Sequence, residues 1–260
     1  MLRIMAIGDV TSPKAAAALA DKLWSIRKEH RIDFVIVNAE NAGFIIGPST
    51  DTAHALLNAG ADVLSGGNHM IQNTQLHAML DSDTRVLRPA NLPAAACGTG
   101  YTIAEAKGYR VLVANVLGRV HMDPPSDSPY TAIETILRRE EGNYDLSLLD
   151  IHAEATGEKV ALALYFDGSF SAIFGTHTHV PTADLQIMPA GTGYVTDLGM
   201  CGAQGGVLGI AKESIFTRYR NGMPARFSPA EGDLYADAVI FSIDEGSSHT
   251  EKIERVKLSL

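Results

Sequence analysis

The sequence predicts an α/β protein with a largely parallel sheet and a C-terminal third built mainly of antiparallel strands. Short apolar runs rich in β-branched residues recur along the chain, and helical patterns lie between the early ones. Many of these runs end in a polar cluster. In open α/β sheets, ligands bind beyond the carboxyl ends of the strands, where such polar residues lie. No linker, repeat or low-complexity segment divides the chain, so we expect residues 1–260 to form a single domain.

The strands are predicted from the apolar runs, which have the length and composition of buried strands. The early runs alternate with helical patterns, which favours parallel pairing, and the last runs follow one another closely, which favours antiparallel pairing. The predicted strands are residues 2–9, 33–40, 61–69, 109–116, 146–152, 171–179, 192–199, 237–244 and 253–260.

The helices are predicted from their end signals and their periodicity. Ser12 and Pro13 are typical of a helix start, with serine as the cap and proline in the first turn. A second helix within residues 49–62 ends near Gly60, which suits a C-terminal cap. Residues 129–139 and 158–166 also have helical spacing of their apolar side chains.

Bulk properties exclude several classes of function. The formal net charge of −9 disfavours a broad surface for nucleic acid or an anionic membrane. The two cysteines form neither a zinc motif nor a disulfide framework. No apolar stretch of about 20 residues predicts a membrane span. We therefore expect a cytoplasmic enzyme or binding protein.

Five predicted strands end in side chains that can bind a metal or act on a substrate. If the strands are parallel neighbours, these ends meet at one edge of the fold. The side chains are Asp9, Glu40, Asn68, His69, His152, His177 and His179.

Each of these signals also has an ordinary structural explanation. Asp9 alone would suit a turn, Glu40 a helix cap and His152 a hydrogen-bonded position in the core. His177 and His179 share one face of an extended chain, which fits two metal ligands or an exposed pair. Carboxylate, amide and imidazole groups at several strand ends together favour a transition-metal site.

The same segments resemble a known family. The set "GD", "NAEN", "GGNH", "DIHAEAT" and "GTHTH" resembles the calcineurin-like metallophosphoesterases, and in particular the bacterial YmdB-type phosphodiesterases. The segments "LRPANLP", "TADLQIMPAGTGYVTDLGM" and "RFSPAEG" extend the resemblance over nearly the whole chain. Three departures from the superfamily belong to the subfamily's own pattern: Thr11 in place of a histidine, Glu40 in place of an aspartate, and the inserted Thr176.

Other departures belong to this chain. Residues 11–14 read "TSPK" where the subfamily commonly has glycines and an arginine, residues 70–72 replace Thr-Trp-Asp, and Cys201 replaces a threonine. We expect retained metal chemistry with an altered fit to the substrate.

The resemblance implies a four-layer α/β/β/α sandwich with mixed sheets and two metal ions at the strand ends. Glu40 would bridge the two ions. The other ligands would be Asp9, Asn41 and His179 for one ion, and Asn68, His152 and His177 for the second. Oxygen and nitrogen ligands without thiolate suit iron or manganese, with zinc as a further candidate.

The resemblance also implies the reaction, in which a hydroxide that bridges the two ions attacks the phosphorus of a phosphodiester. His69, next to the ligand Asn68, is the candidate general acid. The expected substrates are small nucleotide phosphodiesters, including 2′,3′-cyclic and 3′,5′-cyclic nucleotides. Arg88 and Asn91 are candidate substrate contacts, with support of the glycine-rich loops as the equal alternative.

Two other functions stay open from the sequence. One is another two-metal phosphohydrolase, a nucleotidase or a phosphatase. The other is a regulator that uses the site to bind a nucleotide without turnover. A homo-oligomer is compatible with either.

Overall fold

The computed structural model describes all 260 residues and contains two mixed β-sheets. The first sheet has the strand order β2-β11-β12-β1-β3-β4, with β13 paired to β12. Its strands are β1 (Leu2–Ile7), β2 (Asp9–Val10), β3 (Phe34–Asn38), β4 (Val63–Ser65), β11 (Met200–Ala203), β12 (Leu234–Ile243) and β13 (Thr250–Ser259). β1, β3 and β4 are parallel, whereas β12 runs antiparallel to β1, β11 and β13, as the sequence predicts for the C-terminal third.

The second sheet has the order β5-β6-β7-β8-β10-β9, in which β6, β7, β8 and β10 are parallel. Its strands are β5 (Tyr101–Ala106), β6 (Tyr109–Leu117), β7 (Leu146–His152), β8 (Ala172–Thr176), β9 (Gln186–Ile187) and β10 (Gly193–Val195). All nine predicted strands are therefore present. Four further strands were not predicted as such: β5, β9, β11 and β2, of which only Asp9 lies in a predicted range.

The helices begin and end close to the predicted positions. Ser12 caps α1 (Pro13–Glu29) by accepting a hydrogen bond from the Ala15 amide. α2 (Thr50–Asn58) is followed by Gly60, which adopts a φ of +113°. α4 (Pro129–Arg139) and α5 (Thr156–Tyr165) match the predicted ranges. The short elements η1 (Met70–Gln72), η2 (Thr74–Leu76) and α3 (His77–Ser82), and the later α6 (Lys212–Asn221), were not predicted.

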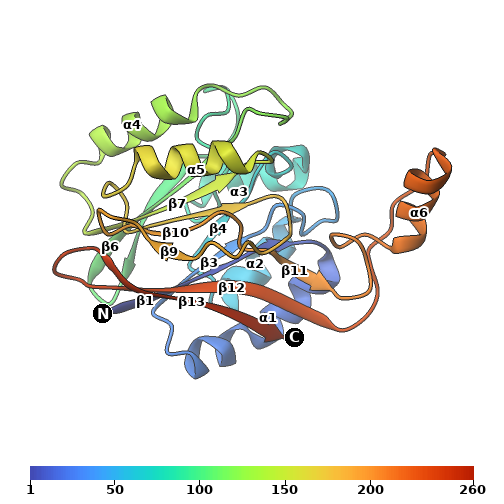
Figure 1. Cartoon of the computed structure of the whole chain (residues 1–260), viewed down its shortest axis with the longest axis horizontal. Helices are drawn as coiled ribbons and strands as arrows, with labels where there is room; N and C mark the ends of the chain where they lie inside the picture. The colour runs from blue at the N-terminus through green and yellow to red at the C-terminus, as the bar shows by residue number, and fades with distance from the viewer.

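Three hydrophobic clusters define the layers of the molecule. One joins α1, α2 and α3 to the first sheet, the second fills the space between the two sheets, and the third joins α4 and α5 to the second sheet. In Figure 1, α4 and α5 lie on one side of the paired sheets and α1 on the other. The fold is thus the four-layer α/β/β/α sandwich that the resemblance implies.

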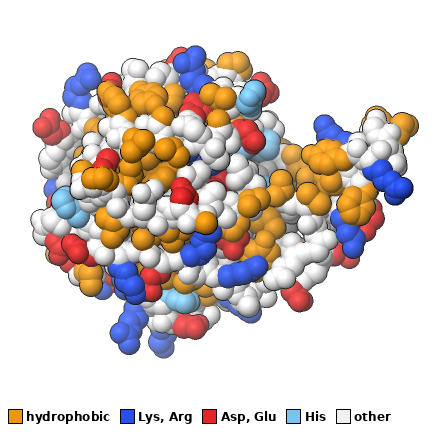
Figure 2. All heavy atoms as spheres, viewed as in Figure 1, with side chains coloured by type: hydrophobic (Ala, Val, Ile, Leu, Met, Phe, Trp, Pro, Cys, Tyr) orange, Lys and Arg blue, Asp and Glu red, His pale blue; other side chains and the backbone are white.

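One segment leaves this compact body. α6 and the loops on either side of it form an arm that projects from the sandwich, and only Ile215 of the helix is buried. Figure 2 shows apolar and basic side chains on this arm. Throughout the chain, none of the helices has the length and apolarity needed to cross a membrane.

Candidate metal centre

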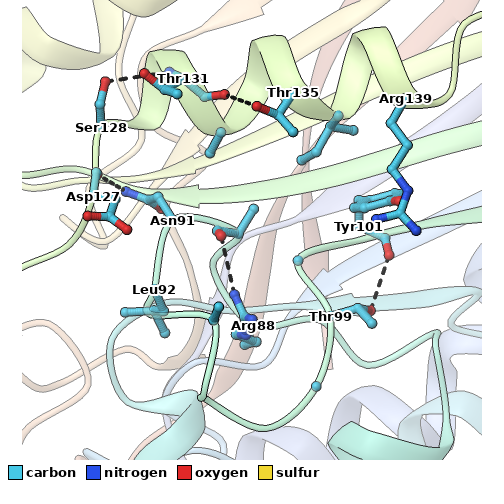
Figure 3. A pocket seen from close by; sticks show the side chains of 16 residues that line it. Arg88, Asn91, Leu92, Thr99, Tyr101, Asp127, Ser128, Thr131, Thr135 and Arg139 are labelled. Atoms are coloured by element: carbon cyan, nitrogen blue, oxygen red, sulfur yellow. Dashed lines mark hydrogen bonds between the residues drawn. The ribbon is translucent and has the colours of Figure 1, made fainter.

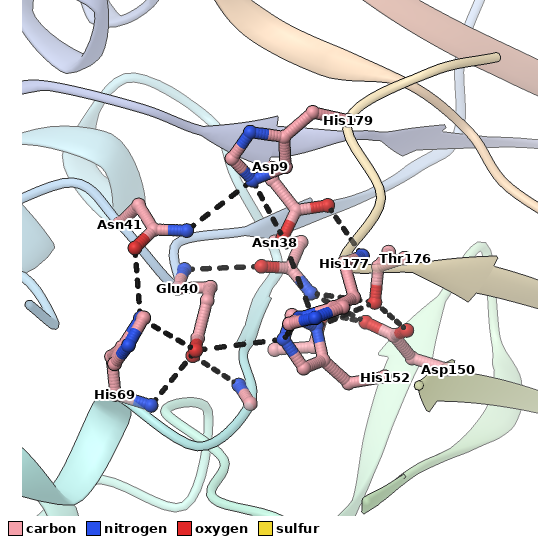
Figure 4. A network of polar contacts seen from close by, with 12 residues as sticks. Asp9, Asn38, Glu40, Asn41, His69, Asp150, His152, Thr176, His177 and His179 are labelled. Carbon is pink, nitrogen blue, oxygen red and sulfur yellow. Dashed lines mark hydrogen bonds and ion pairs between the residues drawn. The ribbon is translucent and has the colours of Figure 1, made fainter. Parts of the chain in front are cut away.

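The predicted strand ends from both sheets meet in one cluster (Figure 4). The first sheet contributes residues at β2 and after β3 and β4, and the second contributes residues at the ends of β7 and β8. Asp9, Glu40 and His152 are completely buried, whereas His177 and His179 are partly exposed in a pocket of about 320 Å³. The clustering follows from topology, because the parallel strands of both sheets direct their carboxyl ends to the same edge.

One part of the cluster contains Asp9, Asn41 and His179. His179 Nε2 lies 3.8 Å from Asp9 Oδ1 and 3.3 Å from Asn41 Nδ2. The Nδ1 of His179 is 3.0 Å from the Leu208 carbonyl oxygen, which accepts only if Nδ1 carries the proton. The neutral ring therefore presents the lone pair of Nε2 to Asp9 and Asn41.

The second part contains His152 and His177. The Thr176 hydroxyl donates to Asp150 Oδ1 at 2.8 Å, so it can only accept from His152 Nδ1, 2.9 Å away. His177 Nε2 lies 3.1 Å from Glu154 Oε2, to which it can donate. The remaining nitrogens, His152 Nε2 and His177 Nδ1, face each other at 3.1 Å.

Glu40 lies between the two parts. Its Oε1 is 3.5 Å from His152 Nε2 and 3.1 Å from His69 Nδ1, and its carboxylate accepts the amides of Gly67 and His69. Burial would raise the pKa of Glu40, but His152 and His69 outweigh burial and hold it well below its ordinary value. Glu40 is thus ionised at neutral pH, and it contacts His152 directly and Asn41 through His69.

The electrostatics of this cluster favour added positive charge. Burial raises the pKa of Asp9, although His179 and His152 oppose this. Burial disfavours a charged His152, yet Glu40 and Asp9 outweigh it and raise the His152 pKa to about 9. Burial and the charge on His152 lower the pKa of His177 to about 3. Glu40 and Asp9 thus favour a positive charge at His152, and that charge together with burial keeps His177 neutral.

The residues present fit metal ions by the state of their donor atoms. His152 Nε2 and His177 Nδ1 direct lone pairs at each other when both rings are neutral, which is unfavourable unless a proton or a cation lies between them. Asp9 Oδ1 and Asn68 Oδ1 are buried without a hydrogen-bond partner, which is costly in a protein interior. No three His, Cys, Asp or Glu side chains are arranged as a finished metal site; the candidate ligand atoms instead contact one another.

Asn68 is the predicted ligand with the weakest link to the others. Its side-chain oxygen is buried and unpaired, but no contact joins it to Glu40, His152 or His177. Its position after β4 is fixed by Gly67, where a Cβ atom would collide with the His152 ring. Coordination by Asn68 stays a prediction.

His69 differs from the ligands beside it. Its Nδ1 contacts Asn41 Oδ1 at 2.9 Å and Glu40 Oε1 at 3.1 Å, and both oxygens are acceptors. The Nδ1 proton is therefore held within the cluster, and no side chain or carbonyl engages the other nitrogen, Nε2. His69 lines the open pocket with Nε2 unengaged, so a proton carried there in the doubly protonated ring would be available to a bound molecule.

The structure adds a supporting network that the sequence analysis missed. Asp150 accepts hydrogen bonds from Ser65 at 2.6 Å, from Asn38 at 3.0 Å and from Thr176 at 2.8 Å, and all of these side chains are buried. Through Thr176 it fixes the orientation of the His152 ring. Asp150 and His152 are two residues apart in β7 and so share a face of the sheet. This spacing is the sequence signal that could have revealed the network.

A buried ion pair supports the turn that carries the two C-terminal histidines. Lys159 Nζ donates to Asp197 Oδ2 at 2.8 Å and to the Thr176 carbonyl at 3.0 Å, and both ionic side chains are fully buried. The other hydrogen bonds of Asp197 include one from the Thr178 amide at 3.1 Å. The pair therefore fixes the backbone on both sides of His177.

The predicted substrate contacts lie elsewhere. The pocket at the metal centre has apolar walls formed by Phe44, Ile45 and Phe227 among others, and neither Arg88 nor Asn91 lines it. Asn91 instead bonds the backbone of Leu117 and of Asp127. Arg88 and Asn91 both line a separate cavity. Direct contact with a substrate at the metal centre is therefore not proposed for them.

Comparison with known proteins settles the family. A family model described as "YmdB-like protein" matches residues 5–256. The chain belongs to the YmdB-like protein family. A similar protein of Bacillus subtilis (strain 168) is named 2′,3′-cyclic-nucleotide 2′-phosphodiesterase, and it is 36% identical over 99% of this chain and 97% of its own length.

Solved structures agree with the YmdB-like assignment. A crystal structure described as a novel phosphatase from Mycoplasma pneumoniae is 30% identical, with a TM-score of 0.91 over 99% of this chain and 93% of that one. A 5′-nucleotidase precursor from Thermus thermophilus shares only the fold, with 10% identity and a TM-score of 0.56 over 100% of this chain and 54% of that one. This YmdB-like chain is a hydrolase of phosphoric esters with a metallophosphoesterase fold.

Proposed function

We propose that this protein is a two-metal phosphodiesterase that hydrolyses nucleotide phosphodiesters, including 2′,3′-cyclic or 3′,5′-cyclic nucleotides. The observation that carries the proposal is the buried convergence of carboxylate, amide and imidazole groups, in which His152 Nε2 and His177 Nδ1 face each other at 3.1 Å beside the unpaired oxygen of Asp9. A proton on His152 would satisfy the contact between the two rings but would leave Asp9 Oδ1 without a partner, whereas bound metal ions would satisfy both. The name of the Bacillus subtilis relative supports a 2′,3′-cyclic substrate in particular.

The division of the ligands between the two ions follows the family resemblance, and the contacts of His179 with Asp9 and Asn41 and of His152 with His177 support it. Asp9, Asn41 and His179 would hold one ion, Asn68 with His152 and His177 the other, and Glu40 both. When bound, the two cations would supply Lewis acids that activate a water molecule and stabilise charge on the phosphate oxygens. Iron or manganese suits this donor set, with zinc as a further candidate.

The chain's own groups then handle the proton and the substrate. In its doubly protonated form, His69 would donate the Nε2 proton to the leaving oxygen, while Glu40 and Asn41 accept from Nδ1–H and orient the ring. Phe44 and Phe227 line the same pocket and offer aromatic faces against which a nucleobase can stack. A nucleotide would thus place its phosphate at the cluster and its base against the apolar wall.

A phosphatase is the second candidate, because the Mycoplasma pneumoniae structure is described as one. A substrate panel separates the two. With manganese or iron added, we expect turnover of a 2′,3′-cyclic nucleotide and of bis(p-nitrophenyl) phosphate. Release of phosphate from monoesters alone, with both diesters intact, would favour the phosphatase. Tight nucleotide binding without turnover of either class would favour a regulator.

A further inference from the structure

A second cavity lies between the segment Arg88–Tyr101 and helix α4 (Figure 3). Its volume of about 710 Å³ falls within the range of small-molecule sites. It shares no lining residue with the pocket of the metal centre. The reaction proposed above assigns it no role.

Arg88 is the unusual residue of this cavity. Only 7% of it is exposed, and no carboxylate lies within ion-pair distance of it. Its Nη1 donates to the carbonyls of Pro89 at 2.7 Å and Ala90 at 3.3 Å, but its Nε is buried without a partner. Burial lowers the pKa of Arg88, yet a guanidinium stays charged at neutral pH. A buried charge without a counter-ion is costly unless an anion pairs with it.

The cavity offers further donors to an anion. Ser128 caps α4 and accepts from the Thr131 amide, so its own O–H remains free, and the Thr131 hydroxyl makes no hydrogen bond within the protein. The first turn of α4 contains no acidic residue, and its amides carry the positive end of the helix dipole. Arg139, in the last turn of the same helix, adds a second cation to the lining.

The remaining polar groups limit what can bind. Thr99 and Thr135 donate their hydroxyl protons to backbone carbonyls, so they present acceptors to the cavity. Asp127 is the one acidic residue of the lining and would repel an anion placed beside it, although it can accept from a hydroxyl group. The ligand thus needs an anionic group near Arg88 and hydroxyl or amine donors elsewhere.

We propose that this cavity binds a small organic phosphate, with Arg88 as the partner of the phosphate group and α4 supplying further donors. A phosphate fits better than a carboxylate because it carries more charge for the Arg88 guanidinium and more acceptor oxygens for the free hydroxyls of the lining. The site is separate from the metal centre, and the proposal does not depend on the function proposed for that centre.

The proposal is tested by measuring the binding of small anions to the full-length chain. Glycerol 3-phosphate and adenosine 3′-monophosphate are the phosphate probes, and citrate is the carboxylate comparison. Because nucleotides also enter the metal centre, calorimetry is done in a His177→Ala background as well as on the wild type. We expect one phosphate probe to bind both proteins. Arg88→Gln should weaken that binding about 10- to 100-fold, the effect of losing a charge-assisted hydrogen bond.

Thr135→Glu gives the second variant, since it adds a negative charge to the cavity without touching Arg88 or its carbonyl partners. Ser82→Glu is its matched control, because Ser82 and Thr135 each donate to the carbonyl four residues earlier in a helix, and Ser82 lies outside the cavity. We expect at least a ~10-fold loss for Thr135→Glu and none for Ser82→Glu. The proposal is overturned if the His177→Ala chain binds neither phosphate, if citrate binds more tightly than both, or if a folded Thr135→Glu chain binds as the wild type does.

Discussion

Asn68 and His69 are neighbours in the chain, yet their side chains have different surroundings. The Asn68 oxygen is buried and unpaired, whereas His69 lines the open pocket with its Nδ1 held by Glu40 and Asn41. A ligand and a proton donor have such environments. The difference between these two residues can be tested one substitution at a time.

His69→Gln should keep the metals and lower kcat by about 10²–10⁴, the range for loss of a general acid. The loss should be largest for a cyclic nucleotide, whose ribose oxygen leaves poorly without a proton, and smaller for bis(p-nitrophenyl) phosphate. Kinetics on both substrates, with metal analysis of the same preparation, measure this. An equal loss on both would indicate charge stabilisation instead, and loss of metal would make His69 a ligand.

His177→Ala and His179→Ala should each remove mainly one of two bound ions, because the two rings belong to different parts of the cluster. Elemental analysis after reconstitution with manganese or iron gives the metal content per chain. His121→Ala, in an exposed loop, is the control and should leave it unchanged. Wild-type protein that takes up neither metal would contradict the two-metal site.

At the scale of elements, sequence patterns predicted which polar side chains follow the strands better than they predicted the buried residues that support those side chains. Asp9, Glu40, His152 and His177 follow long apolar runs, and their convergence requires only parallel pairing. The Asp150 network was missed because its partners Asn38, Ser65 and Thr176 lie on three other strands, and only the shared strand face of Asp150 and His152 hints at it in the sequence. Short strands such as β9 have too few residues to show any periodicity.

The turn after β8 shows why some local geometry needs tertiary contacts. His177 and His179 adopt φ values of +100° and +63°, which are uncommon for residues other than glycine. Lys159 and Asp197, from α5 and from the loop after β10, bond the backbone of this turn. Residues about 20 positions away on either side therefore determine the direction of the two imidazoles.

Lys159→Met should therefore destabilise the protein by about 3–5 kcal/mol, because it leaves Asp197 charged and buried without its partner. It should also weaken metal binding, since the histidine turn loses a hydrogen bond. Urea unfolding and metal titration measure the two effects. Lys252→Met, which breaks an exposed ion pair with Glu254, is the control and should cost less than about 1 kcal/mol. Similar losses for both variants would show that burial of the pair has no special role.

At the scale of the whole molecule, the α/β class followed from the alternation of strands and helices, but the arrangement in two facing sheets came from the family resemblance. A single sequence shows which runs are apolar, not which sheet each joins. β12 illustrates this, because it pairs with β1 from the other end of the chain. The arm around α6 was likewise not predicted, since its few apolar residues resemble those of an ordinary surface helix.

The domain prediction, one unit over residues 1–260, depends on the cluster between the sheets. Phe174 of β8 and Phe241 of β12 meet there with ring centroids 6.2 Å apart, so each sheet buries the other. Phe174→Ala should lower the free energy of unfolding by about 3–5 kcal/mol. Because the core is shared, hydrogen exchange should quicken in β1 and β3 as much as in β6 and β7.

Phe216→Ala, on the exposed face of α6, is the control and should change the free energy of unfolding by less than about 0.5 kcal/mol. Faster exchange confined to the second sheet, with β1 and β3 still protected, would show instead that the two halves unfold separately.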